Sequence, residues 1–438
     1  MRRSILKQDN ARLITRFDVL IFCAFFVSFL HSALALAFLA FLVFLSTRGT
    51  KNCVKALLLL TARGVISSTV AVNLGGSVLK LSVILIASFF IFINTIRESN
   101  RKFMVDSVLG SALAFAVFAV FASFLNSSYP ITAAFKIISF IVPFIAILVG
   151  VNETKEYPWK EYFVLFFGIL FAISLLMVPF ARFRIVNYDF QGIFNHVNLF
   201  GIVGALYVAV LLYSDELKKH PLIRTVALIL MLVMIYLSAS RTGLFSALFA
   251  IAFYYAFGEE SKKAKIVVIS MTALLFLFFI LAEKTTLVSN VSGLINDFIY
   301  KSNTKNILAS RQETLAIAKE KYENSKLFGS GFMVPWIKNF TNYGMSFNLI
   351  VEPGNLIWAI LGDTGIIGMI LFALLVISIF LKGDKRNVFL LVTAFSINMG
   401  EMVFFSSNNM AILVWLLIAL YLSAPQKRVK PIRMYKKG

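Results

Sequence analysis

Residues 355–381 read NLIWAILGDTGIIGMILFALLVISIFL, an almost continuous apolar run. About 20 predominantly apolar residues are enough for an α-helix to cross a bilayer, so this run predicts a membrane-spanning helix. Comparable runs fall at 18–47, 56–72, 76–94, 104–124, 132–150, 162–180, 197–213, 225–238, 242–257, 266–282, 388–402 and 409–423. The first can form one tilted helix or a hairpin of two, so the sequence predicts an all-α integral membrane protein, a polytopic bundle of about 12 to 14 transmembrane helices.

The overall composition supports the same fold class. Hydrophobic residues make up 59% of the 438 residues and charged residues only 14%, and the mean hydropathy is +0.86. These values lie outside the range of soluble globular proteins, so we expect a single transmembrane domain over 1–438. The first apolar run has no small-residue cleavage pattern after it, which indicates a retained anchor rather than a removed signal peptide.

The chain is strongly basic, with 42 Lys and Arg residues against 21 Asp and Glu and a formal net charge of +21. In a soluble protein this excess would suggest nucleic-acid binding. Here the basic residues lie mostly in short loops between apolar runs, as the positive-inside rule requires, so nucleic acid is not an expected partner. Cys23 and Cys53 are the only cysteines, which leaves neither a disulfide framework nor a zinc site.

The basic loops predict the orientation of the spans. Both termini are basic and are predicted to be cytoplasmic, and further basic clusters lie near 48–55, 97–102, 155–160, 218–224, 262–265 and 382–386. The clusters alternate correctly if 18–47 is a hairpin. The remaining connections, 125–131, 181–196, 239–241, 283–354 and 403–408, are then external. We expect the hydrophilic loop 283–354 to carry an active-site lid.

A few arginines lie outside the predicted cytoplasmic loops: Arg63, Arg182, Arg184, Arg241 and Arg311. A charge at membrane depth, or a positive charge on the external side, is unfavourable in free energy, so the position of each of these arginines requires an explanation. For the first three, a side chain that snorkels to lipid head groups is an alternative to substrate binding.

Arg241 ends the short polar sequence SASR at 238–241, between two apolar runs. A guanidinium held at the outer end of a tight helical hairpin can bind phosphate oxygens bidentately. The alternative is that this sequence is simply the tip of a hairpin.

Arg311 lies in the large external loop, next to Ser310. Ser310 and Glu313 have the spacing of a capping box, which predicts a helix over 311–324 and makes Glu313 a capping residue. Arg311 would then occupy the first turn, where free backbone N–H groups and the helix dipole favour an anion. The glycines of LFGSGF at 327–332 suit a sharp turn after this helix.

Two further polar groups stand at the predicted outer boundary. Asn195, His196 and Asn198 lie in GIFNHVNLFG at 192–201, where they can bind sugar hydroxyls or cap the next helix. Glu352 precedes Asn355 in EPGN at 352–355. Its carboxylate can accept a proton from an attacking hydroxyl, or it can simply begin the helix.

The order of these motifs makes the chain resemble a known superfamily. The motifs are the 192–201 segment, the SASR turn, the arginine-led helix ending in LFGSGF, and Asn355 followed by GIIG at 365–368. The superfamily comprises the O-antigen ligases and the Wzy-type O-antigen and exopolysaccharide polymerases. The resemblance covers about residues 180 to 400. It implies a bacterial inner-membrane glycosyltransferase, with its active site on the periplasmic face and both termini cytoplasmic.

The resemblance also implies partners and roles. The donor is a glycan linked to undecaprenyl diphosphate, and Arg241 and Arg311 hold the diphosphate, with Glu352 as a catalytic candidate. From their position and chemistry, Arg182, Arg184, Asn195, His196, Asn198 and Asn355 are candidates for substrate binding. Fixed guanidinium groups stabilise a departing diphosphate in a site of low dielectric constant, so no metal or other cofactor is expected. Membrane lipid and a polysaccharide chain-length regulator are further candidate partners.

One departure from the family pattern bears on the reaction. Ligases of the family usually carry a histidine directly before the asparagine, as a candidate base, and here that position is Gly354. This favours a repeat-unit polymerase over a ligase that passes finished polymer to lipid A-core or another acceptor. A lipid-linked oligosaccharide transporter is a third alternative. A carrier would place its charges near mid-membrane in broken helices, whereas here they gather at one face.

Overall fold

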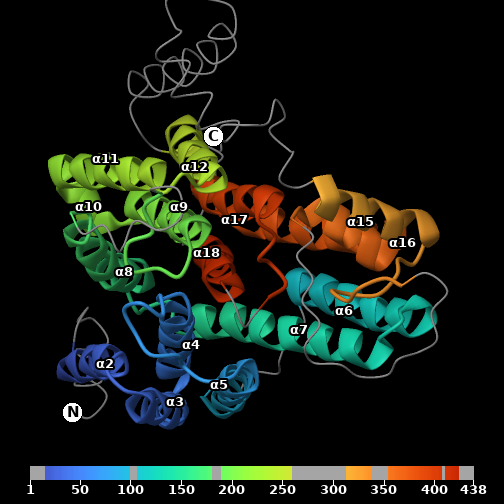
Figure 1. Ribbon diagram of the computed structural model, residues 1–438, viewed down its shortest axis with the longest axis horizontal. Helices are drawn as coiled ribbons and strands as arrows, with labels where there is room; N and C mark the ends of the chain where they lie inside the picture. The colour runs from blue at the N-terminus through green and yellow to red at the C-terminus, as the bar shows by residue number, and fades with distance from the viewer. Residues whose placement is uncertain are drawn as a thin grey trace, which may run out of the picture.

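The computed structural model describes residues 15–98, 106–179, 189–258, 312–337, 354–406 and 410–423. Within these ranges the chain is almost entirely helical (Figure 1). The helices are α2 (Arg16–Val27), α3 (Ser32–Ser46), α4 (Thr50–Gly64), α5 (Ser77–Glu98), α6 (Ser107–Asn126), α7 (Pro130–Glu153), α8 (Trp159–Leu176), α9 (Val197–Tyr213), α10 (Asp215–Lys219), α11 (Pro221–Leu237), α12 (Arg241–Phe257), α15 (Gln312–Asn324), α16 (Leu356–Lys382), the short 3-10 helix η5 (Lys385–Asn387), α17 (Val388–Gly400) and α18 (Ala411–Ser423).

Many of these helices have the length or the composition of membrane spans. In the described part of the chain, α5, α6, α7, α8 and α16 are long and apolar enough to cross a bilayer. Shorter apolar helices are α3, α9, α11, α12 and α18. The predicted fold class, an all-α polytopic membrane protein, is therefore confirmed. The predicted span 266–282 lies outside the described residues, and of the 283–354 loop the structure describes residues 312–337 and 354.

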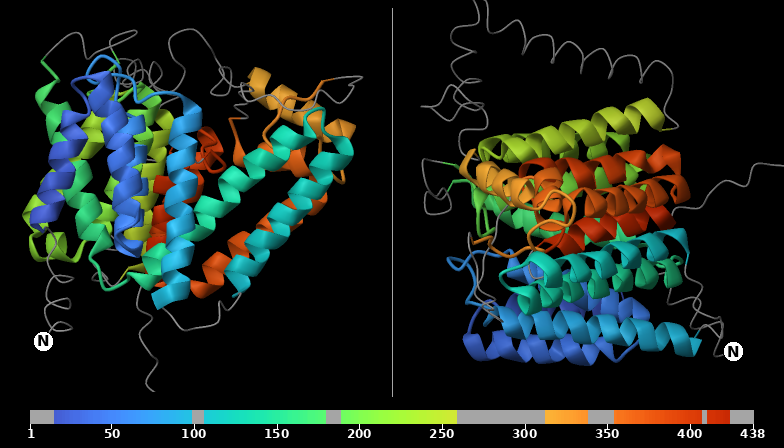
Figure 2. Two further views of the ribbon diagram at one scale, coloured as in Figure 1. Left: turned by 90° about the horizontal axis from the view of Figure 1, so that it is seen from below. Right: turned by 90° about the vertical axis from the view of Figure 1, so that its right-hand side faces the viewer.

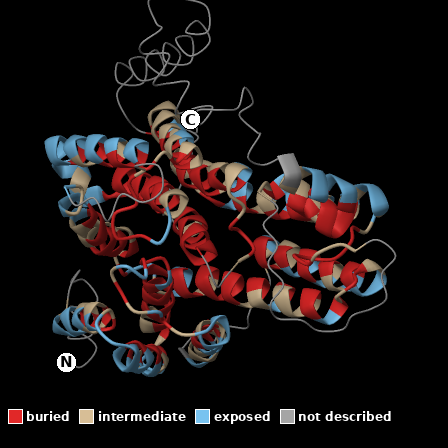
Figure 3. Cartoon of the chain, in the orientation of Figure 1, coloured by how far each residue is buried: buried red, intermediate tan, exposed pale blue. Residues whose placement is uncertain are grey.

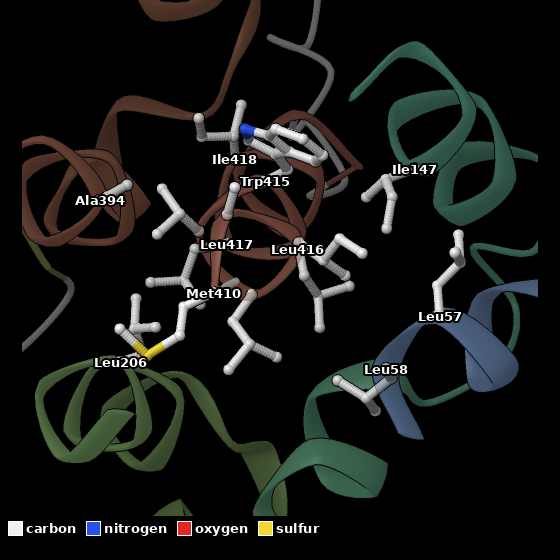
Figure 4. Close-up of a cluster of buried hydrophobic side chains, with 14 of the residues drawn as sticks. Leu57, Leu58, Ile147, Leu206, Ala394, Met410, Trp415, Leu416, Leu417 and Ile418 are labelled. Carbon is white, nitrogen blue, oxygen red and sulfur yellow. The ribbon is translucent and has the colours of Figure 1, made fainter. Parts of the chain in front are cut away.

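Burial in the bundle follows the pattern of a protein that faces lipid. Large apolar side chains are exposed along the outer surface of α11, including Leu222, Val226, Ile229 and Val233, whereas α18 is buried on all sides (Figure 3). Figure 4 shows α18 at the centre, where Trp415, Leu416 and Leu417 lie among side chains of α4, α7, α9 and α17. A helix that is apolar all round belongs in such an interior.

The first apolar segment, 18–47, forms the hairpin of two helices that the charge alternation requires. A capping box of Thr15 and Asp18 begins α2. Asp18 also forms a buried ion pair with Lys55 of α4, whose ammonium group lies 4.6 Å from the ring centre of Tyr157. Because this buried partner stabilises Lys55 inside the protein, α4 spans 50–64 and begins before the predicted run 56–72.

The connections gather at two opposite ends of the bundle (Figure 2). At one end, which we call the basic end, Lys160 pairs with Asp215 and Lys382 pairs with Asp106. Partial burial alone would raise the pKa of both carboxyl groups. The interactions with the lysine partners lower the pKa by more than burial raises it, so each pKa lies below its usual value. These ion pairs join loops that the sequence predicts to be cytoplasmic.

The other end, which we call the outer end, holds the connections predicted to be external. The backbone N–H of Ser67 donates to the carbonyl of Ile193 at 2.9 Å, and that of Asn195 donates to Val65 at 2.8 Å. The N–H of Phe190 donates to the carbonyl of Leu237, also at 2.9 Å. Backbone hydrogen bonds thus tie the α4–α5, α8–α9 and α11–α12 connections together, although these segments lie far apart in sequence.

Candidate functional site

At the outer end of the bundle, the side chains that cap helices α9 and α16 are residues singled out from the sequence. His196 caps α9, with Nδ1 accepting from the N–H of Asn198 at 3.1 Å. Asn355 caps α16, with Oδ1 accepting from Ile357 at 3.0 Å and from Trp358 at 3.2 Å. Capping, one of the two roles left open for Asn195, His196 and Asn198, is therefore performed by His196, and Asn355 caps α16 in the same way.

The N-terminal ends of α16 and α9 are each joined to α17 by a side-chain amide. The side-chain amide of Asn355 also donates to the carbonyl of Met399 at 3.0 Å, which joins the start of α16 to the end of α17. The side-chain amide of Asn198 donates to Oε1 of Glu401 at 2.9 Å, which joins the start of α9 to the same end of α17. Asn195 and His196 are exposed beside these contacts. The C-terminal end of α17 therefore lies between two helix N-termini.

The N-terminus of α12, which begins at Arg241, is held against both α9 and α17 by glycines. A Cβ atom at Gly243 would overlap the backbone carbonyl of Gly201 on α9, and one at Gly400 would overlap the side chain of Thr242. Small residues allow such close approach of helices within a membrane. The three glycines thus fix the position of Arg241 relative to α9 and α17.

The turn before α12 is as tight as the sequence SASR suggests. Ala239 has a φ of 51°, an uncommon conformation for a residue with a side chain. Ser240 then caps α12, with its hydroxyl accepting from the N–H of Gly243 at 3.3 Å. Arg241 is half-buried in the first turn of α12, where the positive end of the helix dipole favours an anion. A guanidinium beside a helix N-terminus has the chemistry needed to bind a phosphate group.

Helix α15, which follows Arg311 in the sequence, is locked onto α16 by a buried ion pair. Lys321 of α15 pairs with Asp363 of α16, and each side chain is 3% exposed. The ammonium group of Lys321 also donates to the carbonyls of Gly331 at 3.1 Å and Val334 at 3.0 Å. Asp363 also accepts from the N–H of Met333 at 2.8 Å. The ion pair therefore fixes α15 and the segment that follows it.

Helix α16 is broken where this segment docks. Gly365 has a φ of 66° inside α16, and a Cβ atom there would overlap the carbonyl of Leu327. The N–H groups of Ile366 and Ile367, released by the break, donate to the carbonyls of Lys326 and Leu327 at 2.8 and 3.3 Å. The LFGSGF turn thus completes the hydrogen bonding of a discontinuous span, as broken helices at membrane depth require.

The predicted helix 311–324 is present as α15, Gln312–Asn324. In Figure 1 and in the left view of Figure 2, its N-terminal end is the end nearer to α17. Arg311 directly precedes this end in the sequence. Arg311 itself, the capping residue Ser310, and Arg182, Arg184 and Glu352 lie outside the described residues.

Arg63 belongs to the structural part of the molecule. It is 2% exposed and donates to the hydroxyl of Ser28 at 2.9 Å, to the carbonyl of Ser28 at 3.2 Å, and to the carbonyl of Val72. It therefore stabilises the α2–α3 turn and the α4–α5 connection instead of snorkelling to lipid head groups.

Two features of the site were not foreseen in the sequence. The Lys321–Asp363 pair joins residues 42 positions apart, and an acidic residue inside the 355–381 run was the one available signal for it. Glu401 is the other, a carboxylate near the end of the 388–402 run. No group of three or more potential metal ligands among His, Cys, Asp and Glu occurs within the ranges that the structure describes.

Comparison with known proteins identifies part of the chain. Residues 226–373 match a family model described as O-antigen ligase. The matched segment contains α12 with Arg241, α15, and the broken helix α16 up to its second half. It confirms the resemblance that the order of motifs indicates. Searches of curated proteins and of solved structures returned no match.

Proposed function

Residues 226–373 match the family model described as O-antigen ligase, and from this premise we propose that the chain is a member of the superfamily of O-antigen ligases and Wzy-type polymerases, and within it the polymerase of O-antigen or exopolysaccharide repeat units. It transfers a glycan from polyprenyl diphosphate to a sugar hydroxyl of another lipid-linked repeat unit. The reaction takes place at the outer end of the bundle, on the periplasmic face of the bacterial inner membrane.

The donor is held by arginine and by helix N-termini. The guanidinium of Arg241, in the first turn of α12, binds oxygens of the diphosphate bidentately. Arg311, directly before α15, supplies the second guanidinium. When the bond between sugar and diphosphate breaks, negative charge grows on the leaving oxygen. Fixed guanidinium groups stabilise this charge without reorganisation, so the proposed reaction requires no metal ion.

Gly354 is the observation that favours a polymerase over a ligase. It directly precedes the Asn355 cap and has a φ of 69°, a conformation that residues with side chains seldom adopt. The imidazole of the ligase pattern, in which histidine stands at this position, is therefore absent. A polymerase needs no group adapted to lipid A-core, because its acceptor is a second lipid-linked repeat unit.

The orientation follows from charge. The loops that meet at the basic end carry the clustered lysines and arginines, and cytoplasmic loops are enriched in these residues. Both termini then lie in the cytoplasm, and the outer end with Arg241 faces the periplasm. There it meets lipid-linked repeat units, and a polysaccharide chain-length regulator is a proposed partner at this face.

Deletion of the gene, followed by analysis of the lipid-linked glycans, tests the function. A polymerase defect leaves single repeat units on the carrier, and in spheroplasts an added lectin reaches them from outside. Long polymer on the carrier would identify a ligase and contradict the proposal. Single units that the lectin cannot reach would identify a transporter instead.

A further inference from the structure

Glu401 is a carboxylate at the outer end that has no role in the reaction described so far. It is the C-cap of α17, where its N–H donates to the carbonyl of Ile397 at 2.9 Å. The C-terminal end of a helix carries the negative end of the dipole and favours a cation. An acidic side chain is therefore unfavourable there, and helix stability does not explain it.

The backbone around Glu401 is held in one conformation. The fully buried Asn398 accepts from the N–H groups of Val403 at 2.9 Å and Phe404 at 2.8 Å. Its amide donates to the carbonyl of Ala394 at 2.7 Å. One side chain thus closes the helix and shapes the turn after it, so that Glu401 is presented from a rigid support.

The side chain of Glu401 is directed toward the start of α9. Its Oε1 accepts from the amide of Asn198 at 2.9 Å, and Asn198 lies next to the exposed His196 and Asn195 in sequence. Glu401 is half-buried, so part of this residue is open to solvent. Asn198 therefore orients a carboxylate at the surface where an acceptor sugar would arrive.

The close contact between α17 and α12 sets Glu401 near the phosphate site. Gly400 packs against Thr242 so closely that a Cβ atom on it would overlap the threonine side chain. Glu401 directly follows Gly400, and Arg241 directly precedes Thr242. The residues that carry a carboxylate and the guanidinium proposed to hold the diphosphate are thus adjacent in sequence to this close contact between two helices.

From this arrangement we infer that Glu401 is the general base that accepts the proton of the attacking sugar hydroxyl, and that Asn198 is its positioning residue. This inference rests on the proposed function and adds to it a catalytic residue. Glu352, the candidate chosen from the sequence, lies outside the described residues and is included in the test below.

The transfer reaction can be written with these residues so that every bond and proton is accounted for. The hydroxyl oxygen of the acceptor sugar bonds to the anomeric carbon of the donor glycan, and its proton passes to Glu401. The bond from that carbon to the diphosphate oxygen breaks, and the electron pair stays on the diphosphate beside Arg241. Half-buried Glu401 then releases the proton to water. Carboxylates activate hydroxyls for attack on an anomeric carbon in the same way in glycosidases.

The test uses the full-length protein in membrane vesicles. The substrate is the polyprenyl-diphosphate-linked glycan extracted from a strain that lacks the gene, and the readout is elongation of the glycan. We expect Glu401→Gln, which keeps the shape of the side chain but not its basicity, to lower kcat about a hundredfold or more. KM should stay within about threefold, since a base acts on the chemical step. Glu401→Asp should retain more activity than Glu401→Gln.

Companion variants separate the alternatives. Asn198→Ala should lower kcat about tenfold through poorer orientation, with KM little changed. Glu323→Gln, an exposed carboxylate on α15, is the matched control and should behave like the wild type. If Glu401→Gln keeps kcat within about threefold while Glu352→Gln loses it, Glu352 is the base and the inference fails. If the wild-type protein does not elongate the extracted glycan, the proposed function fails instead.

Discussion

The ammonium group of Lys321 and the carboxylate of Asp363 form an ion pair that is almost completely buried, between α15 and the part of α16 before its break. Ser330 reinforces it, with its hydroxyl donating to the carbonyl of Lys321 at 2.7 Å and its N–H donating to that of Gly362 at 2.9 Å. The segment that follows Arg311 is therefore an integral part of the bundle, and its position depends on a residue inside the apolar helix α16.

Asp363→Ala should destabilise the protein strongly. It leaves the ammonium group of Lys321 buried without its counter-ion, which typically costs about 3–5 kcal/mol. We expect a clearly lower Tm in detergent, together with loss of polymer in cells. Glu216→Ala removes an exposed ion pair with Lys219 at the basic end, and should change the Tm little. An equal Tm for Asp363→Ala and the wild type would contradict the view that this ion pair holds α15 against α16.

The glycine contacts at the outer end should be required for activity. Gly243→Ala places a methyl group against the backbone of Gly201, where no side-chain rotation can relieve the overlap. The outer end of α12 must shift, and misplacement of a binding group by about 1 Å can cost a hundredfold in rate. Gly64→Ala is the control, because a Cβ atom there meets nothing within 4 Å. Elongation assays on both variants compare the two positions, and equal rates would argue against a fixed Arg241.

Arg311 is predicted to act as the second diphosphate ligand. Arg311→Ala should abolish polymer while the protein stays in the membrane. Arg311→Lys should rescue poorly, because an ammonium group does not reproduce the bidentate fork. Lys326→Ala removes an exposed positive charge from the same external segment and should leave polymer length unchanged. Polymer of normal length in Arg311→Ala cells, analysed on gels, would exclude this role.

The orientation of the bundle can be measured by cysteine labelling. In a background with Cys23 and Cys53 replaced, a cysteine at exposed Glu323 on α15 should react with a membrane-impermeant maleimide added to spheroplasts. A cysteine at exposed Glu216 on α10, at the basic end, should react only after the membrane is permeabilised. The same assay at Lys338 extends the test to the rest of the external loop. The reverse pattern would invert the proposed topology.

The spans and their order could be predicted because hydropathy depends on local sequence. The run 197–213 and the observed helix α9 coincide, and the helix after Arg311 ends at Asn324, as predicted. The start of α4 was misjudged because Lys55 is buried by an ion pair with Asp18, which lies 37 residues earlier in the chain. Such tertiary partners override local hydrophobicity.

The site was predicted only in part, for a related reason. Arg241 and the capping residues His196 and Asn355 stood out as polar groups at predicted span boundaries. The break in α16 depends on the carbonyl groups of Lys326 and Leu327, and the orientation of Glu401 depends on Asn198, which lies 203 residues away. Neither relationship can be recognised from spacing along the chain.

The most direct test of the central claim is the lipid-linked glycan pool of cells whose only copy of the protein carries Arg241→Ala. With the protein present in the membrane at the wild-type level, the account predicts single repeat units on the carrier and no polymer, and Arg241→Lys should give nearly the same pool. Polymer of wild-type length in the Arg241→Ala cells would contradict a diphosphate site built on this arginine.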